Sequence, residues 1–485
     1  MRASKLLKVI LRLPPDAYPA LQRFLQSPYF QGQRRADEQL ALFEYLWAGR
    51  ATEDPQYFDK EVTYARLFPE QPRFKGKLEK LMSRLFRSVE AFLVQRQLEK
   101  DRTERQDLLA LLSAYTDLQL PGLFELRRKK LANQLDQMTP DNPHHFWERQ
   151  ELERRITEFQ SFSGLRDSDL NLPATHHQFD LYYLLAKLEL ACQLLARHLF
   201  VFKVEPLDDS LEALDLLEPL YLKKYAAIPV IQVYHQAYQL LRSFWSLDHR
   251  QRYIQFRDLL EEHNDTLSEE HLKTLQTIAR SFCLRQYQIG VAGYRSYTFE
   301  LYQKHLLRGW LYHKGRLLQS LFSNIVTLAL REKAYDWTRQ FLEDHRDRTT
   351  GSDTAEAVYN YNLSQYYFYT QQYDAALNLL SDSYRDPYYK VSAKRLEIKI
   401  LYETESDLLD PRMDAFKIFI YRLPEGSFNR RSKEMNRNFI DLLRQIKLPK
   451  TLGHPDRIDK LAEKVRASPQ LSDKEWLLDK LELMR

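Results

Sequence analysis

The sequence predicts an all-α protein, in which helical hairpins stack into an α-α superhelix behind a more irregular helical unit at the N-terminus. Apolar residues recur at spacings of three and four along nearly the whole chain, as they do on the buried side of helices. Glycine, which disfavours helix, supplies only 12 of 485 residues, against roughly 7% in average proteins. Long stretches rich in Leu, Lys, Glu and Arg favour the same structure.

Residues 1–100 are predicted to form the N-terminal helical unit. A short helix ends near Ser27-Pro28, because a residue that precedes proline avoids the helical conformation. Further helices are expected at about 36–48, around 62–67, and at about 74–98. The apolar stripe of the last of these consists of Leu78, Leu81, Leu85, Val89 and Phe92.

Residues 101–450 are predicted to form the array of helical hairpins, and residues 451–485 its C-terminal capping helices. Seven of the nine residues from Glu99 to Asp107 are charged, which marks the joint between the first two parts. We expect a long loop from Gly164 to Thr175 and shorter breaks at 205–209 and 346–353. Helix starts are predicted where a capping residue precedes a Glu by three positions, namely at Thr266, Asp353 and Ser472.

An internal repeat supports the array. Two sets of residues have the same internal spacings of 4, 6, 3 and 4 and are offset by 38 residues. They are Ile325, Ala329, Tyr335, Thr338 and Leu342, followed by Leu363, Tyr367, Tyr373, Ala376 and Leu380. Each set predicts a helix, a tight turn and a second helix, and a fixed period of this length is typical of solenoid proteins.

The second copy resembles the tetratricopeptide signature, with small residues where two helices touch and an aromatic residue at the turn. It departs from that signature at Asn360, where a large apolar residue is usual. The resemblance is closest for this copy, weaker for the copy before it, and diffuse upstream of residue 305.

The chain as a whole resembles an uncharacterised family of tetratricopeptide-like, all-helical proteins from Bacteroidetes-type bacteria. The resemblance rests on Phe24-Leu25, Ser27-Pro28-Tyr29-Phe30, Leu67-Phe68-Pro69, Leu81-Met82-Ser83, Tyr182-Tyr183, Lys187-Leu188, Cys192, Asn324-Ile325-Val326-Thr327, Asp336-Trp337 and Asn438-Phe439-Ile440. It extends over nearly the whole chain and implies the helical fold, but no activity.

No recognised catalytic or cofactor motif occurs in the sequence. It contains no GxGxxG, GxxxxGK[ST], GxSxG, HExxH or CxxC pattern, so we expect neither an enzyme, nor a cofactor, nor a metal site. Cys192 and Cys283 lie in apolar helical patterns and are expected to be buried, reduced thiols. With no long apolar span, this predicts a cytoplasmic protein that does not insert into membranes.

The expected function is binding of a protein or peptide, as a scaffold or adaptor. The tetratricopeptide resemblance implies that the first helix of each hairpin lines a concave groove with its second, fifth, ninth, twelfth and thirteenth positions. The residues placed in the groove in this way are Ser320, Ser323, Thr327, Leu330 and Arg331 of the first copy and Val358, Tyr361, Gln365, Phe368 and Tyr369 of the second. The candidate binding residues among them are Arg331, Tyr361, Gln365, Phe368 and Tyr369. The alternative is that Phe368 and Tyr369 pack against the next hairpin or the C-terminal helix.

A second hypothesis is a nucleic-acid-binding regulator that uses the basic N-terminal unit. Residues 1–130 carry 24 Lys and Arg against 17 Asp and Glu, whereas residues 131–485 carry 48 against 50. The candidate contacts with nucleic acid are Lys77, Lys80, Arg84 and Arg87, opposite the apolar stripe of the long helix. A row of basic residues in this position is also the usual solvated face of an amphipathic helix.

Overall fold

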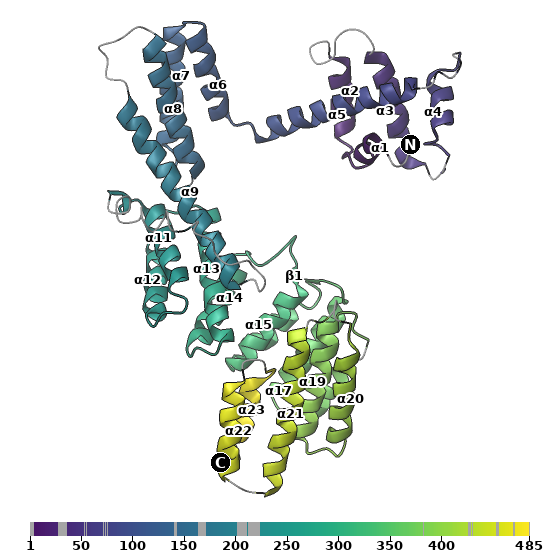
Figure 1. The fold of residues 1–485 in the computed structure, drawn as a ribbon, viewed down its shortest axis with the longest axis vertical. Helices are drawn as coiled ribbons and strands as arrows, with labels where there is room; N and C mark the ends of the chain where they lie inside the picture. Colours follow the sequence, from purple (N-terminus) through teal and green to yellow (C-terminus); the bar gives the residue numbers. More distant parts are fainter. Residues whose placement is uncertain are drawn as a thin grey trace. The chain divides into compact units, whose positions relative to one another are not determined.

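The computed structural model describes residues 4–27, 36–52, 54, 56–70, 72, 74, 76–139, 143–162, 171–200, 211, 224–381, 383–424, 428, 430–452, 455–468 and 471–484. These residues form 22 α-helices, one short 3-10 helix and two strands of two residues each (Figure 1). The prediction of an all-α protein is therefore confirmed.

The chain divides into two compact units, which interleave along the sequence. The first unit comprises residues 1–137 and 148–175, and the second comprises residues 138–147 and 176–485. Helix α5 ends at Asp101, close to the predicted joint at residue 100. The predicted division into 1–100, 101–450 and 451–485 stays a prediction.

The helices of the first unit are α1 (Lys5–Ile10), α2 (Ala17–Gln26), α3 (Ala36–Ala48), the 3-10 helix η1 (Gly49–Ala51), α4 (Lys60–Leu67), α5 (Lys77–Asp101), α6 (Glu104–Asp117), α7 (Pro121–Asp136) and most of α8 (Pro143–Phe162). The predicted stripe of α5 is confirmed, because all five of its apolar side chains are buried. They pack in one core with apolar residues of α1 to α4.

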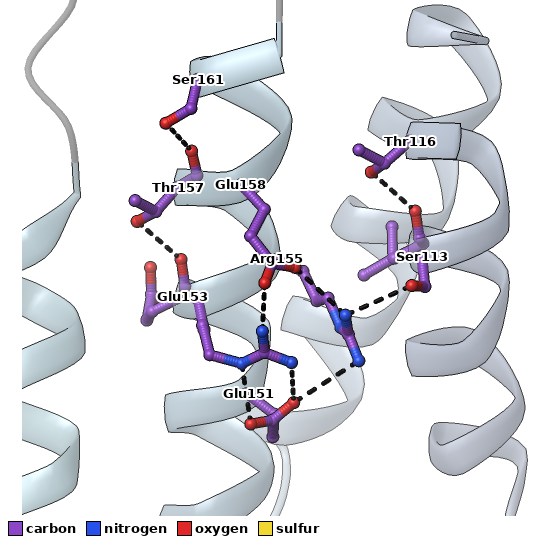
Figure 2. A network of polar contacts seen from close by, with 10 residues as sticks. Ser113, Thr116, Glu151, Glu153, Arg155, Thr157, Glu158 and Ser161 are labelled. Carbon is purple, nitrogen blue, oxygen red and sulfur yellow. Dashed lines mark hydrogen bonds and ion pairs between the residues drawn. The ribbon is translucent and has the colours of Figure 1, made fainter. Parts of the chain in front are cut away.

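A network of charged and polar side chains connects α8 to α6 within the first unit (Figure 2). Arg155 of α8 donates to the hydroxyl of Ser113 on α6 at 3.2 Å. The same guanidinium forms ion pairs with Glu151 at 3.7 Å and Glu158 at 3.1 Å, one helical turn away on either side. These carboxylates hold the arginine extended toward α6, so the network has a packing role.

The second unit contains the start of α8 and most of α9 (Leu172–Phe200), followed by α11 (Pro229–Arg242), α12 (His249–Glu262), α13 (Glu269–Gln288), α14 (Tyr294–Leu307), β1 (Leu317–Leu318), α15 (Gln319–Arg331), α16 (Tyr335–Asp344), β2 (Thr349–Thr350), α17 (Ala355–Tyr369), α18 (Tyr373–Leu379), α19 (Pro387–Glu403), α20 (Leu409–Arg422), α21 (Arg430–Leu452), α22 (Pro455–Ala467) and α23 (Lys474–Glu482). From α11 to α20 the helices pack in consecutive hairpins, and the first helices α15, α17 and α19 contact one another in turn (Figure 1). Strands β1 and β2, which precede α15 and α17, pair in parallel.

The same turn closes five of the hairpins. One residue in each turn has a positive φ: Gln119 (53°), Gly290 (90°), Lys333 (59°), Gln371 (61°) and Glu405 (52°). The N–H of the next residue donates to the carbonyl five positions earlier, as in Gln372 to Tyr367 at 2.8 Å. This is the Schellman ending of a helix, which satisfies carbonyls that the helix leaves unbonded. Four of the five turns adopt it without glycine.

The predicted helix starts are close but shifted by one or two residues. The residues at the N-cap positions are Ser268 for α13, Thr354 for α17 and Asp473 for α23. Asp353 does not cap α17, because its carboxylate accepts hydrogen bonds from the N–H groups of Arg385 and Asp386 at the start of the next hairpin.

The expected interruptions have mixed outcomes. The predicted loop at 164–175 is wrong at its end, because α9 begins at Leu172. The strand β2 lies inside the predicted break at 346–353. The break at 205–209 lies outside the described residues.

Both cysteines are free and buried, as predicted. Burial raises the pKa of each thiol well above its ordinary value.

We expect Gln371→Gly to stabilise the protein, because a side chain in the left-handed region costs roughly 1–2 kcal/mol that glycine avoids. The matched control is Gln372→Gly, at a residue with φ of −91°, where glycine should destabilise by roughly 0.5–1 kcal/mol through lost backbone entropy. Urea denaturation of both variants measures the difference. A destabilising Gln371→Gly would mean that the turn stores no strain at this residue.

Candidate functional site

Two first helices, α15 and α19, contact the same segment of the chain, and α17 packs against both of them. The turn residues Lys333, Gln371 and Glu405 align the three hairpins at offsets of 38 and 34 residues. With this alignment, the fifth, ninth, twelfth and thirteenth positions form what we name the shared face. Its members are Ser323, Thr327, Leu330 and Arg331 of α15, Tyr361, Gln365, Phe368 and Tyr369 of α17, and Arg395, Lys399, Tyr402 and Glu403 of α19.

The predicted groove residues of α17 are largely covered. Tyr361, Gln365 and Phe368 are buried, and Tyr369 is half-buried. The ring of Tyr361 packs edge-on against Tyr389 at a centroid distance of 5.3 Å. The expectation that these side chains are open to a partner is therefore wrong for the first three, and their burial agrees with the packing alternative.

Polar contacts also fix the middle of α17. The amide of Gln365 accepts a hydrogen bond from Thr327 on α15 at 3.1 Å and donates to Asn362 at 3.1 Å. Burial raises the pKa of the Tyr361 phenol well above its ordinary value, so this group stays neutral. Side chains held in this way connect neighbouring hairpins.

The segment that contacts the α15 and α19 residues of the shared face comprises residues 471–484, which we name the docking segment. Its first turn brings Asp473 between two cations of α19. The carboxylate accepts from Nε of Arg395 at 2.5 Å and from Nζ of Lys399 at 3.0 Å. All three side chains are largely buried, with 12% of Asp473, 20% of Arg395 and 5% of Lys399 exposed.

The cations keep Asp473 charged despite its burial. Burial alone would raise the pKa of this carboxyl, but Lys399 and Arg395 hold it below its ordinary value. The residue also has a left-handed backbone, with φ of 49°, and its side chain does not cap α23. The carboxylate therefore pairs with α19 instead of capping α23, as the side chain of an N-cap aspartate usually does.

A second carboxylate of the docking segment faces α15. Glu475 lies 3.7 Å from Nε of Arg331 and 3.8 Å from Nη1 of Arg295 on α14. Arg331 also donates to the hydroxyl of Tyr287 at 2.5 Å. The predicted groove residue Arg331 therefore does face the shared surface, where it meets an acidic side chain of the same chain.

Trp476 completes the contact with α19. Its indole N–H donates to Glu403 at 2.8 Å, and its ring packs edge-on against Tyr402 at 5.3 Å. The Lys399 ammonium lies 5.5 Å from the centre of the indole and 4.6 Å from the ring of Phe368, within the range of cation–π attraction. One turn further along α23, Lys480 pairs with the same Glu403 at 2.7 Å.

Four residues of this contact were not predicted from the sequence, namely Arg395, Lys399, Asp473 and Trp476. The first two could have been found by extending the repeat one hairpin further, from Gln371 to Glu405. The last two lie more than seventy positions from their partners on α19, and no local pattern encodes that contact.

The basic face of α5 is only partly exposed. Lys80 and Arg87 are exposed, whereas Lys77 and Arg84 are half-buried. The ammonium of Lys77 lies 3.7 Å from the ring centre of Phe68, and Arg87 donates to the backbone carbonyl of Ser83. The structure thus engages part of this row in local contacts, and nucleic-acid binding stays a prediction.

No protein-family model, curated protein or solved structure matches the chain. Across the described ranges, no group of His, Cys, Asp and Glu side chains could hold a metal ion. No helix among the same residues has the length and apolar character needed to cross a membrane.

We expect Tyr361→Ala to lower the free energy of unfolding by about 3–5 kcal/mol, as truncation of buried aromatic side chains does. The control is Tyr421→Ala on α20, where 82% of the residue is exposed and the cost should stay within about 0.5 kcal/mol. Urea denaturation tests both variants. If Tyr361→Ala lowers the free energy of unfolding as little as the control does, Tyr361 is not part of the core.

We also expect Asp473→Asn to release α23, because it leaves two buried cations without their carboxylate, a change that costs about 3–5 kcal/mol. Hydrogen exchange should show α23 losing protection by a factor of about 100 or more. Asp479→Asn makes the same chemical change at an exposed residue of the same helix and should leave protection unchanged. Equal protection in the two variants would contradict the structural role of the ion cluster.

Proposed function

We propose that this protein is a non-enzymatic, protein- or peptide-binding scaffold, built as a tetratricopeptide-like superhelix with the shared face as its concave binding surface. One observation carries the proposal. Equivalent positions of two hairpins, Arg331 on α15 and Glu403 on α19, contact a single helical segment, the docking segment, and further residues of α19 add charge pairs and a cation–π contact. The face already holds a peptide-like ligand supplied by its own chain.

The chemistry of the face supports a binding role. Arg331, Arg395 and Lys399 supply charge, and Tyr369 and Tyr402 supply aromatic surface. Arginine and aromatic residues are enriched among the residues that contribute most to protein interfaces. Two free, buried cysteines fit a reducing compartment, so we place this activity in the cytoplasm.

The test is quantitative capture from a lysate of the cells that make the protein, with the full-length chain as bait. The altered bait carries Arg331→Gln with Lys399→Gln on the shared face. The control bait carries Arg339→Gln on α16 with Lys417→Gln on α20, which removes the same charges from second helices. Circular dichroism first establishes that all three baits have equal helix content.

The proposal predicts at least one protein that the wild-type and control baits capture and the altered bait loses by about tenfold or more, as for a central interface charge. Capture that is identical for all three baits would show that the shared face binds no partner.

A further inference from the structure

We propose that the ligand of the shared face is an acidic, aromatic helical peptide, and that the docking segment is its intramolecular competitor. This inference rests on the proposed function and specifies the partner and its regulation. The evidence is the pattern that the face recognises in its own chain: Asp473, Glu475 two residues later, Trp476 directly after it, and Lys480 one turn beyond.

Each element of this pattern meets a complementary group. The first carboxylate lies between Arg395 and Lys399, and the second faces Arg331. The indole offers its N–H to Glu403 and its ring to Lys399. A peptide without the carboxylate would leave Lys399 buried without a counter-charge. The face therefore distinguishes acidic peptides from other peptides by charge, and not only by the surface area that they bury.

Charge complementarity extends to the whole segment. Residues 471–484 carry four acidic and two lysine side chains, opposite a face that presents Arg331, Arg395 and Lys399. The segment's outer side is open, with Asp479 exposed and Leu483 79% exposed. Buried ion pairs add little net stability compared with apolar packing, and the segment also buries Leu471, Leu477 and Leu481 in a core shared with α20 to α22. The charged contacts therefore select an acidic helix, whereas the apolar side chains supply most of the affinity.

Competition follows from the covalent connection. A tethered segment has an effective concentration in the millimolar range for short linkers, so a free peptide of equal intrinsic affinity cannot displace it at micromolar concentration. The partner must therefore bind more tightly than the docking segment or meet a chain in which that segment is already released.

The test uses the full-length chain and a synthetic peptide of residues 471–484 with a fluorescent label. In the released chain, Asp473→Asn and Trp476→Ala weaken the internal segment and leave the shared face intact. A matched peptide carries the same two substitutions. Hydrogen exchange verifies that residues 474–484 lose protection while α15, α17 and α19 keep theirs; if the double variant loses helix content, Trp476→Ala alone replaces it.

Fluorescence anisotropy should show the native-sequence peptide binding the released chain at least about tenfold more tightly than it binds the wild-type chain, because the internal competitor is gone. The matched peptide should bind the released chain about tenfold more weakly or not at all. Adding Lys399→Gln to the released chain should abolish the difference between the two peptides.

Three results would overturn the inference. The first is equal affinity of both peptides for the released chain. The second is no binding to a released chain whose face is intact. The third is concentration-dependent association of full-length chains in light scattering, which would make a second copy the occupant. The peptide could fail to bind while the lysate capture still finds a partner that depends on Arg331 and Lys399. That result would support the proposed function and reject only the acidic, aromatic helical peptide as its ligand.

Discussion

One backbone constraint determines where the side chains of the second unit meet. Each of three successive hairpins ends its first helix with a left-handed residue, at Lys333, Gln371 and Glu405, followed by the same backbone hydrogen bond. Because that turn fixes the end of the first helix, it also fixes which residues lie one, two and three turns before it. Cations contributed by α15 and α19, and the aromatic side chains of α17, thus come to face one surface although more than sixty residues separate the first from the last.

The ion cluster around Asp473 depends on that alignment. Its carboxylate stays charged inside the protein because two cations, four residues apart on one face of α19, offset the loss of water. The left-handed conformation of Asp473 places the carboxylate toward α19 rather than toward the N–H groups of its own helix. Local strain in the docking segment is therefore compensated by a contact with a distant helix, as is often the case at functional sites.

Helical periodicity and the repeat were sufficient to predict the fold class, the buried stripe of α5 and the paired helices around Tyr335 and Tyr373. The tetratricopeptide resemblance also implied that Arg331 and Tyr369 share one surface. Periodicity and the repeat could not show that Tyr361 and Phe368 are covered. Tyr361 packs against Tyr384 and Tyr389, and Phe368 packs against Tyr373 and the ammonium of Lys399. The repeat does not encode these contacts. Equally, the capping pattern located the final helix to within one residue, but it could not show that Asp473 pairs with α19 instead of capping its own helix. Contacts between residues that are close in the sequence could be predicted, and contacts between residues that are far apart in the sequence could not.

The position of the docking segment affects how shortened forms of this protein would behave. Without residues 471–484, Arg331, Arg395 and Lys399 would lose their acidic counterparts, and the chain's formal charge would rise by two from its present value of +5. Such a surface attracts any polyanion through counterion release, whatever its sequence. Binding of a truncated chain to DNA, RNA or heparin would therefore reflect the basic side chains exposed by the truncation. It would not be evidence that the intact protein binds nucleic acid.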